Sequence, residues 1–164
     1  MTASKTRAGA ANGRAGHELD DRELAAWRGF LRVHTALVKA LDAELEAVHK
    51  LPLSHYDVLI NLRAAPGQRL RMAELADRVL LSRSGMTRLV DRLARDGLIV
   101  RDACDSDARG CFAVLTPAGR GVLEQARPTH LAGVRERFLA HIADDELDAL
   151  ARIWERVLPG AAKT

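Results

Sequence analysis

The 164-residue sequence contains only two cysteines, too few for the disulfide framework of a small secreted domain. It contains no apolar run near the roughly 20 residues that a membrane-spanning helix needs. Its N-terminus has no hydrophobic segment of the kind found in secretory signals. We therefore predict a cytoplasmic protein with no membrane contact.

Motifs of common enzymes are also missing. The sequence has no glycine-rich phosphate loop, no His-Glu-x-x-His pair and no Gly-x-Ser-x-Gly elbow. Its six histidines are scattered, with no close pair at metal-ligand spacing. We predict no catalytic residues, no cofactor and no metal ion, and keep a zinc site built from separated residues as a minor alternative.

Residues 82–96 carry the clearest local pattern. Ser82 is suited to cap a helix by accepting a backbone N–H of the first turn, and Gly97 is suited to end it in the left-handed conformation. One apolar stripe recurs at helical spacing: Met86, Leu89, Val90 and Leu93. The other face is polar and rich in arginine: Arg83, Ser84, Thr87, Arg88, Asp91, Arg92 and Arg95. The pattern predicts an amphipathic helix with a basic exposed face.

The flanking segments complete a winged helix-turn-helix. A short helix over residues 72–79 is separated from Ser82 only by Leu80 and Leu81, which is a helix-turn-helix spacing. Residues 98–102 and 111–115 are rich in β-branched and apolar side chains and flank a polar loop, so they predict a hairpin. Leu70 is a candidate for a short strand that pairs with this hairpin. The predicted fold class is mainly α with a small β-hairpin wing (α+β).

Four further helices are predicted around this unit. The first runs over 24–49 and stops before Pro52, and the second runs from His55 to Ala64 with Ser54 as its cap. A third starts at Thr116-Pro117, with proline at the favoured first position and Pro128 as an expected kink or break. A last helix opens at Asp144, because acidic side chains favour the positive end of a helix.

Charge is unevenly distributed along the chain. Residues 1–17 contain three basic and no acidic side chains, and residues 63–109 contain ten basic and seven acidic. Residues 18–62 are net acidic, and residues 110–164 are neutral. The positive excess therefore coincides with the winged helix, where a nucleic acid would be met, and with a tail over residues 1–17 that we expect to be disordered.

The helix over residues 82–96, which we call the recognition helix, and the predicted wing together resemble the MarR family of bacterial transcription regulators. The resemblance rests on Asp91-Arg-Leu-x-x-x-Gly97-Leu98 and on Asp107-x-Arg109 followed by Leu115-Thr116. It extends over residues 24–158. Many members have two consecutive arginines after the wing aspartate, whereas the first is Ala108 here. The resemblance implies that Arg109 enters the minor groove and that Asp107 holds the shape of the wing.

These observations lead to a residue-level hypothesis for binding double-stranded DNA. The base-edge readers in the major groove are expected to be Ser84, Thr87 and Arg88. The phosphate contacts are expected to be Ser82, Arg83 and Arg92. The absence of a second wing arginine is expected to weaken non-specific phosphate affinity more than sequence reading.

The first and last helices are too apolar for surfaces outside a small winged-helix core. Four large side chains mark the expected dimer interface: Trp27, Phe30, Leu150 and Trp154. The resemblance implies the same homodimer, so residues 18–50 and 117–160 are assigned to dimerisation and residues 51–116 to DNA binding. A two-fold dimer predicts a pseudo-palindromic operator.

Other interpretations stay open. The resemblance suggests a repressor relieved by a small aromatic ligand, for which the sequence identifies no binding residues. One alternative is a dimeric winged-helix adaptor without specific DNA contact. Another is a redox-switched regulator that uses Cys104 and Cys111, which flank the wing loop.

Overall fold

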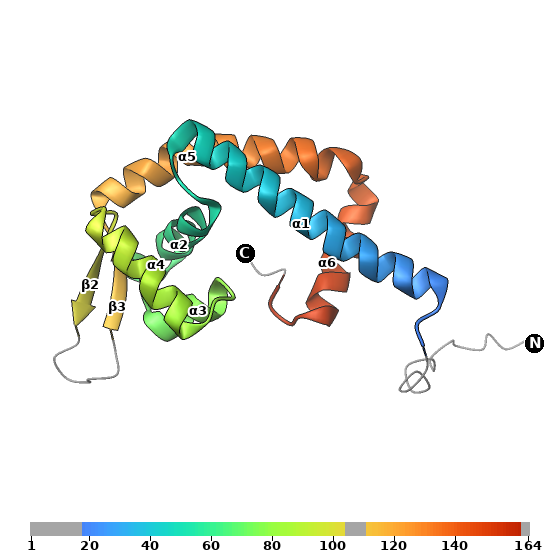
Figure 1. Cartoon of the computed structure of the whole chain (residues 1–164), viewed down its shortest axis with the longest axis horizontal. Helices are drawn as coiled ribbons and strands as arrows, with labels where there is room; N and C mark the ends of the chain where they lie inside the picture. The colour runs from blue at the N-terminus through green and yellow to red at the C-terminus, as the bar shows by residue number, and fades with distance from the viewer. Residues whose placement is uncertain (1–17, 104–110, 162–164) are drawn as a thin grey trace, which may run out of the picture. The chain divides into compact units, whose positions relative to one another are not determined.

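A computed structural model describes residues 18–103 and 111–161 and shows a mainly helical chain with a small antiparallel sheet (Figure 1). The helices are α1 (Asp21–His49), α2 (Leu53–Ala64), α3 (Met72–Arg78), α4 (Arg83–Arg95), α5 (Pro117–Arg137) and α6 (Asp144–Val157). The strands are β1 (Arg69–Arg71), β2 (Ile99–Ala103) and β3 (Cys111–Leu115). No helix in the described ranges is long and apolar enough to cross a membrane. The predicted fold class is confirmed.

The sheet has the order β1-β3-β2, with both pairings antiparallel. Leu70 lies opposite Ala113, so the predicted short strand does pair with the hairpin. Leu70, Ala113, Leu115 and Ile99 are buried on one face of the sheet. Because neighbouring side chains on a strand point to opposite faces, Arg69, Arg71, Phe112 and Val114 belong to the other, outer face.

The core lies between this sheet and α2 to α5. The predicted stripe of α4 is confirmed, since Met86, Leu89, Val90 and Leu93 are all at most 2% exposed. Gly119 marks a close approach, because a Cβ atom added there would lie 2.0 Å from the carbonyl oxygen of Leu98. The absence of a side chain at Gly119 therefore lets the first turn of α5 contact the base of the hairpin.

The start of α2 corrects one prediction. Ser54 is not the cap: the helix begins at Leu53, and Ser54 is exposed within its first turn. The N–H of Leu53 instead donates to Oδ1 of Asp42, on α1, at 2.8 Å. A carboxylate on a neighbouring helix thus satisfies a donor that the cap residue Pro52 has no side-chain acceptor to satisfy.

Pro128 does not break α5, which continues from Pro117 to Arg137. Proline removes the hydrogen bond to the carbonyl four residues earlier, at Glu124. Both Glu124 and Pro128 are exposed, so water can reach the carbonyl that has no backbone partner. Exposure therefore lowers the cost of the missing hydrogen bond.

The chain divides into two parts, residues 1–36 and 37–164. In the first part, residues 21–36 of α1 bury no side chain. In the second part, α1 contributes Leu41 and Leu45 to the core. Gly133 of α5 is buried, and a Cβ atom there would lie 2.7 Å from Leu41. A side chain at position 133 would therefore force α1 and α5 apart.

Candidate nucleic-acid interface

The N-terminus of α4 is held by its predicted cap. The Oγ atom of Ser82 accepts the backbone N–H of Gly85 at 3.1 Å and lies 3.3 Å from Oγ of Ser84. Before it, Leu80 has a left-handed backbone (φ +56°), which turns the chain between α3 and α4. Gly97 has φ +72°, as predicted for the residue after the helix.

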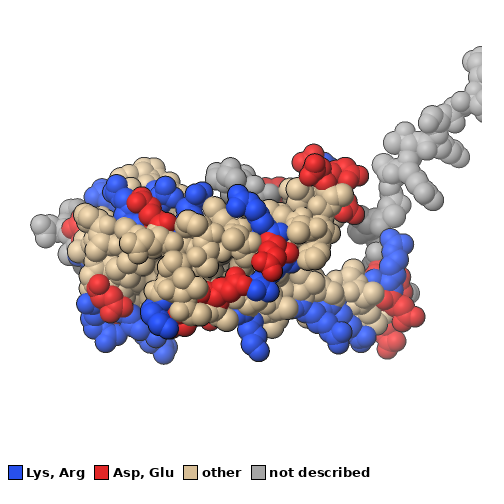
Figure 2. Space-filling view, turned by 90° about the horizontal axis from the view of Figure 1, so that it is seen from above, with Lys and Arg blue, Asp and Glu red and all other residues tan. Residues whose placement is uncertain are grey.

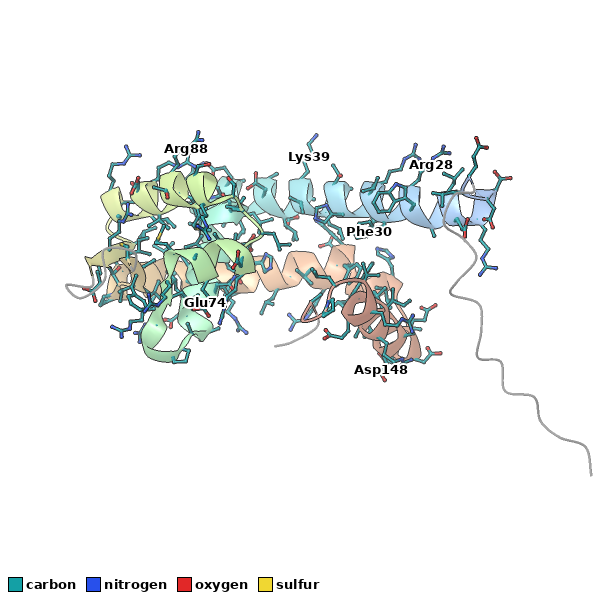
Figure 3. All side chains as sticks on the ribbon, turned by 90° about the horizontal axis from the view of Figure 1, so that it is seen from below. Arg28, Phe30, Lys39, Glu74, Arg88 and Asp148 are labelled. Carbon is teal, nitrogen blue, oxygen red and sulfur yellow. The ribbon has the colours of Figure 1, made fainter. Side chains whose placement is uncertain are left out.

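The polar face of α4 is exposed except at Asp91, which is half-buried. All of the DNA-contacting candidates on or beside it are exposed: Ser82, Arg83, Ser84, Thr87, Arg88 and Arg92. Figure 3 shows Arg88 projecting outward from α4. Thr87 donates its hydroxyl hydrogen to the carbonyl of Arg83 at 3.0 Å, which leaves a lone pair and the methyl group to contact a partner.

The arginines on this face lack local neutralisation. Arg83, Arg88 and Arg92 form no ion pair with any carboxylate in the described part of the chain, whereas Arg78 on α3 pairs with Glu74 at 2.8 Å. Lys and Arg side chains gather around the part that carries the hairpin (Figure 2). Charge held without a local partner is suited to neutralise the phosphates of a nucleic acid.

An ion pair links the recognition helix to the hairpin. The guanidinium of Arg101 on β2 donates to Oδ1 of Asp91 on α4. A hydrogen bond with Cys111 on β3, followed by the bond with Asp91, raises the pKa of Arg101. Arg101 therefore ties β2 of the hairpin to α4. Sequence reasoning missed this role, although Asp91 stood inside the motif that carried the family resemblance.

The tip of the predicted wing is not among the described residues. Cys104, Asp107, Ala108 and Arg109 lie outside the described residues. The proximity of Cys104 to Cys111 therefore stays a prediction. Cys111 itself is a half-buried free thiol.

The four predicted interface residues lie in different parts of the chain. In the first part, Trp27 and Phe30 are 52% and 42% exposed, with ring centroids 6.0 Å apart. In the second part, Leu150 and Trp154 are half-buried on α6. No residue of α6 is fully buried, although Leu147, Leu150, Ile153, Trp154 and Val157 form a continuous apolar stripe.

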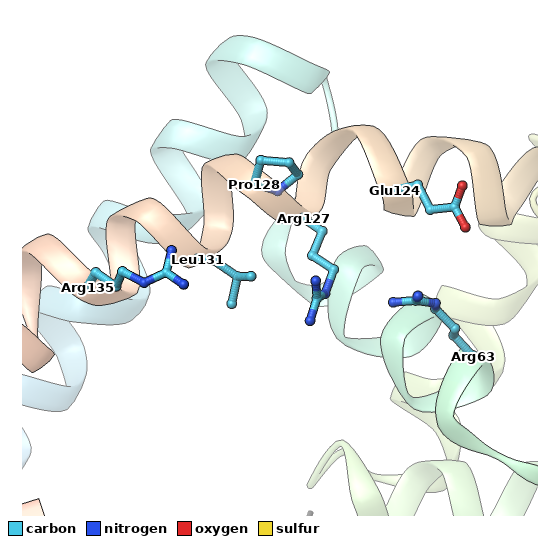
Figure 4. A pocket seen from close by; sticks show the side chains of 6 residues that line it. All are labelled: Arg63, Glu124, Arg127, Pro128, Leu131 and Arg135. Carbon is cyan, nitrogen blue, oxygen red and sulfur yellow. The ribbon is translucent and has the colours of Figure 1, made fainter.

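A cavity of about 400 Å³ opens between α2 and α5 (Figure 4). Arg63 on α2 and Arg127 on α5 point toward the same space. The rest of the lining comes from α5: Glu124, Pro128, Leu131 and Arg135. Three guanidiniums against one carboxylate make this cavity suited to an anion with an apolar body.

Titratable groups lie in and around α2. The ring of Tyr56 packs against that of His130 with centroids 4.4 Å apart, and Nδ1 of His130 is buried with no hydrogen-bond partner among the described residues. Burial lowers the pKa of His130 and is the main cause that raises the pKa of Tyr56. Burial also raises the pKa of Asp57 to about 6. In the described ranges no three His, Cys, Asp or Glu side chains come together as a metal site.

Comparison with known proteins identifies the fold and the family. A family model for the MarR family matches residues 49–110. AbsC, a MarR family transcriptional regulator from Streptomyces coelicolor, is 33% identical, with a TM-score of 0.80 over 86% of this chain and 95% of that one. Sco3205, a MarR family transcriptional regulator from the same organism solved in complex with DNA, is 32% identical, with a TM-score of 0.83 over 92% of this chain and 97% of that one.

A curated relative agrees with these structures. The HTH-type transcriptional regulator MhqR of Bacillus subtilis is 29% identical over 86 residues, which are 52% of this chain. The match spans 59% of the length of MhqR, less than two thirds. Together with the winged helix, the matched structures show that the chain belongs to the MarR family of transcription regulators, which are non-enzymatic DNA-binding proteins.

Proposed function

We propose that the protein is a homodimeric repressor that binds a pseudo-palindromic operator with α4 in the major groove. One observation carries this proposal: α4 exposes Arg83, Arg88 and Arg92 without ion pairs among the described residues, over a stripe that is entirely buried. Sco3205 was solved in complex with DNA, which supports DNA as the partner here. We place the protein in the cytoplasm, where its operator would lie.

The three base readers are assigned by chemistry. Arg88 has the fork that matches the two acceptors on the major-groove edge of guanine. Thr87 presents its methyl group to a thymine methyl, since its hydroxyl hydrogen is engaged by Arg83. Ser84 lies beside the cap and is small enough to let the first turn of α4 approach the bases.

The phosphate contacts fix the register of α4. Arg83 and Arg92 supply the charge, and Ser82 can donate its hydroxyl hydrogen to a phosphate while its oxygen accepts from Gly85. On the wing, Arg109 is assigned to a narrow minor groove and Asp107 to wing shape, both on family resemblance. The ion pair of Arg101 with Asp91 would keep the wing at a set distance from α4.

Dimerisation is supported by the apolar surfaces of α1 and α6. Trp27 and Phe30 are exposed on α1, and the stripe of α6 contains no fully buried residue. Contiguous apolar side chains at a protein surface often mark interaction surfaces. A two-fold dimer would present two copies of α4 about 34 Å apart, one turn of DNA.

Regulation by a small ligand is supported by the cavity between α2 and α5. Arg63 and Arg127 converge there next to Leu131. An aromatic carboxylate would place its charge on the guanidiniums and its ring against Leu131 and Pro128. Titration calorimetry with benzoate derivatives tests this assignment, and an Arg127→Ala variant that binds them as tightly as the native protein would refute it.

Selection of bound fragments from the source genome tests the proposed function. We expect recovery of one inverted repeat, and binding to it that weakens steeply as salt rises. Weak binding to any DNA, with no recovered motif, would instead support a winged-helix adaptor. Equal operator affinity in peroxide and in dithiothreitol would exclude redox control through Cys104 and Cys111.

A further inference from the structure

The outer face of the sheet carries a cluster that the proposed function does not use. On this face two arginines of β1 lie over one aromatic ring of β3. The guanidinium carbon of Arg69 is 4.7 Å from the centroid of the Phe112 ring, and that of Arg71 is 5.1 Å from it. Arg69 and Arg71 are exposed, and Phe112 is half-buried. We name Arg69, Arg71 and Phe112 the β1 patch.

The charge of the β1 patch is only weakly neutralised. Arg69 is 4.0 Å from Oδ2 of Asp102, and both side chains are more than half exposed, so this pair contributes little. Arg71 forms no ion pair with a carboxylate in the described ranges. Close by, Arg120 on α5 hydrogen-bonds to Oε1 of Gln68, which directly precedes β1. The edge of the sheet is therefore basic.

The ring also orders the two guanidiniums. A cation over an aromatic face is attracted to it, and stacking restricts the rotamers of a long side chain. An arginine that is already held loses less conformational entropy when it binds a partner. Its planar fork matches the geometry of a phosphate, which it can bind through two hydrogen bonds. The β1 patch is thus prepared to bind phosphates.

The register shows where the β1 patch faces. Arg71 lies opposite Phe112, one residue after the start of β3 at Cys111, and Arg69 lies opposite Val114, nearer the base. Arg71 is therefore at the same end of the sheet as the loop of the hairpin. In sheet order β2, which contacts α4 through Arg101, is on the opposite side of β3. The two arginines of the β1 patch thus belong to the edge strand of the sheet on the other side of β3 from β2.

Resting on the proposed function, we propose that the β1 patch binds backbone phosphates of the DNA that flanks each half-site. α4 would read one major groove, and the wing would cross the adjacent minor groove. Arg69 and Arg71 would contact DNA farther from the centre of the operator. Phosphate contacts of this kind carry no sequence information but add affinity and register. The DNA segment that contributes to affinity would then be longer than the segment whose base pairs determine specificity.

Duplex length tests this proposal. The native full-length dimer is compared with an Arg69→Ala/Arg71→Ala variant on two duplexes, one trimmed to the inverted repeat and one with about ten extra base pairs at each end, one turn of DNA. We expect the native protein to bind the long duplex more tightly and the variant to show no such advantage. On the long duplex the salt slope should fall by about 0.9 for each phosphate that the variant no longer neutralises.

Three further variants keep the test decisive. An Arg69→Lys/Arg71→Lys variant keeps the charge without the fork, and Phe112→Leu keeps both arginines without the ring, so both should reduce the length advantage to an intermediate value. Arg156→Ala, an exposed arginine on α6, should leave the length advantage intact. Circular dichroism confirms that each variant is folded.

The outcomes separate this proposal from the proposed function. If the native protein prefers no operator, the proposed function fails. If the native protein prefers its operator and the double alanine variant keeps the full length advantage, the β1 patch does not bind DNA. An acidic protein surface would then replace DNA as the proposed partner. An equal decrease in affinity on both duplexes would place the arginines inside the half-site and overturn the flanking assignment.

Discussion

Helices α4 and α6 have the same kind of amphipathic pattern but differ in burial. In α4 the four apolar side chains of the stripe are at most 2% exposed. In α6 none is fully buried, and Val157 remains 72% exposed. The pattern alone predicts a helix with one apolar face, but not which surface covers that face. For α4 the cover is the core of its own lobe, and for α6 we propose a second copy of the chain.

The same substitution in each helix should have very different effects. Leu93→Ala should lower the free energy of unfolding by about 2–5 kcal/mol, because it leaves a cavity in a closed core. Leu150→Ala should cost much less in dilute protein and more as concentration rises, because its apolar contacts are proposed to lie with the partner. Urea unfolding at two protein concentrations measures both effects. A large destabilisation by Leu150→Ala that does not depend on concentration would mean that α6 packs within one chain.

Trp154→Ala should weaken the dimer directly. Buried tryptophans at the centre of interfaces often contribute 2 kcal/mol or more, about a 30-fold change in dissociation constant. Sedimentation velocity measures the change, and Asp148→Ala, an exposed position on the same helix (Figure 3), is the control. A Trp154→Ala protein that dimerises like the native one would remove α6 from the proposed interface.

The carboxyl of Asp57 predicts a smaller, pH-dependent effect. Burial raises its pKa from 3.8 to about 6, so the folded state holds its proton over a range in which the unfolded state has released it. Stability should therefore fall as pH rises from about 4 to 6 and stay level above that. Asp57→Asn should remove this fall, gaining about 1–2 kcal/mol at pH 7 after allowance for partial exposure. Thermal unfolding across pH tests this, and a variant with the native pH profile would contradict it.

Local patterns predicted α4 well because its cap, stripe and C-terminal glycine all lie within sixteen residues. The correction at Ser54 has a different origin, since Asp42 reaches the start of α2 from another helix. The same holds for Arg101 with Asp91, and for the two arginines that share the ring of Phe112. These contacts depend on strand register and helix packing, which no short segment encodes by itself.

The cavity between α2 and α5 also could not be predicted from short segments of the sequence. Arg63 and Arg127 are far apart in the sequence and carry no motif, so only the fold brings them to one space. By contrast, the resemblance to the MarR family rested on two short motifs and was sufficient to identify the family. Each motif consists of residues that are close together in the sequence.

The central claim is that α4 reads bases through Arg88. Its most direct test is the affinity of native and Arg88→Ala dimers for an operator series in which every base pair is varied in turn. Arg95→Ala, on the same helix with Nε 3.4 Å from the carbonyl oxygen of Asp91, is the control. We predict that Arg88→Ala weakens binding by about 1–3 kcal/mol and becomes indifferent at one position in each half-site, while Arg95→Ala keeps the native preferences. An Arg88→Ala protein with uniformly weaker binding and unchanged base preferences would contradict the account and make Arg88 a phosphate contact.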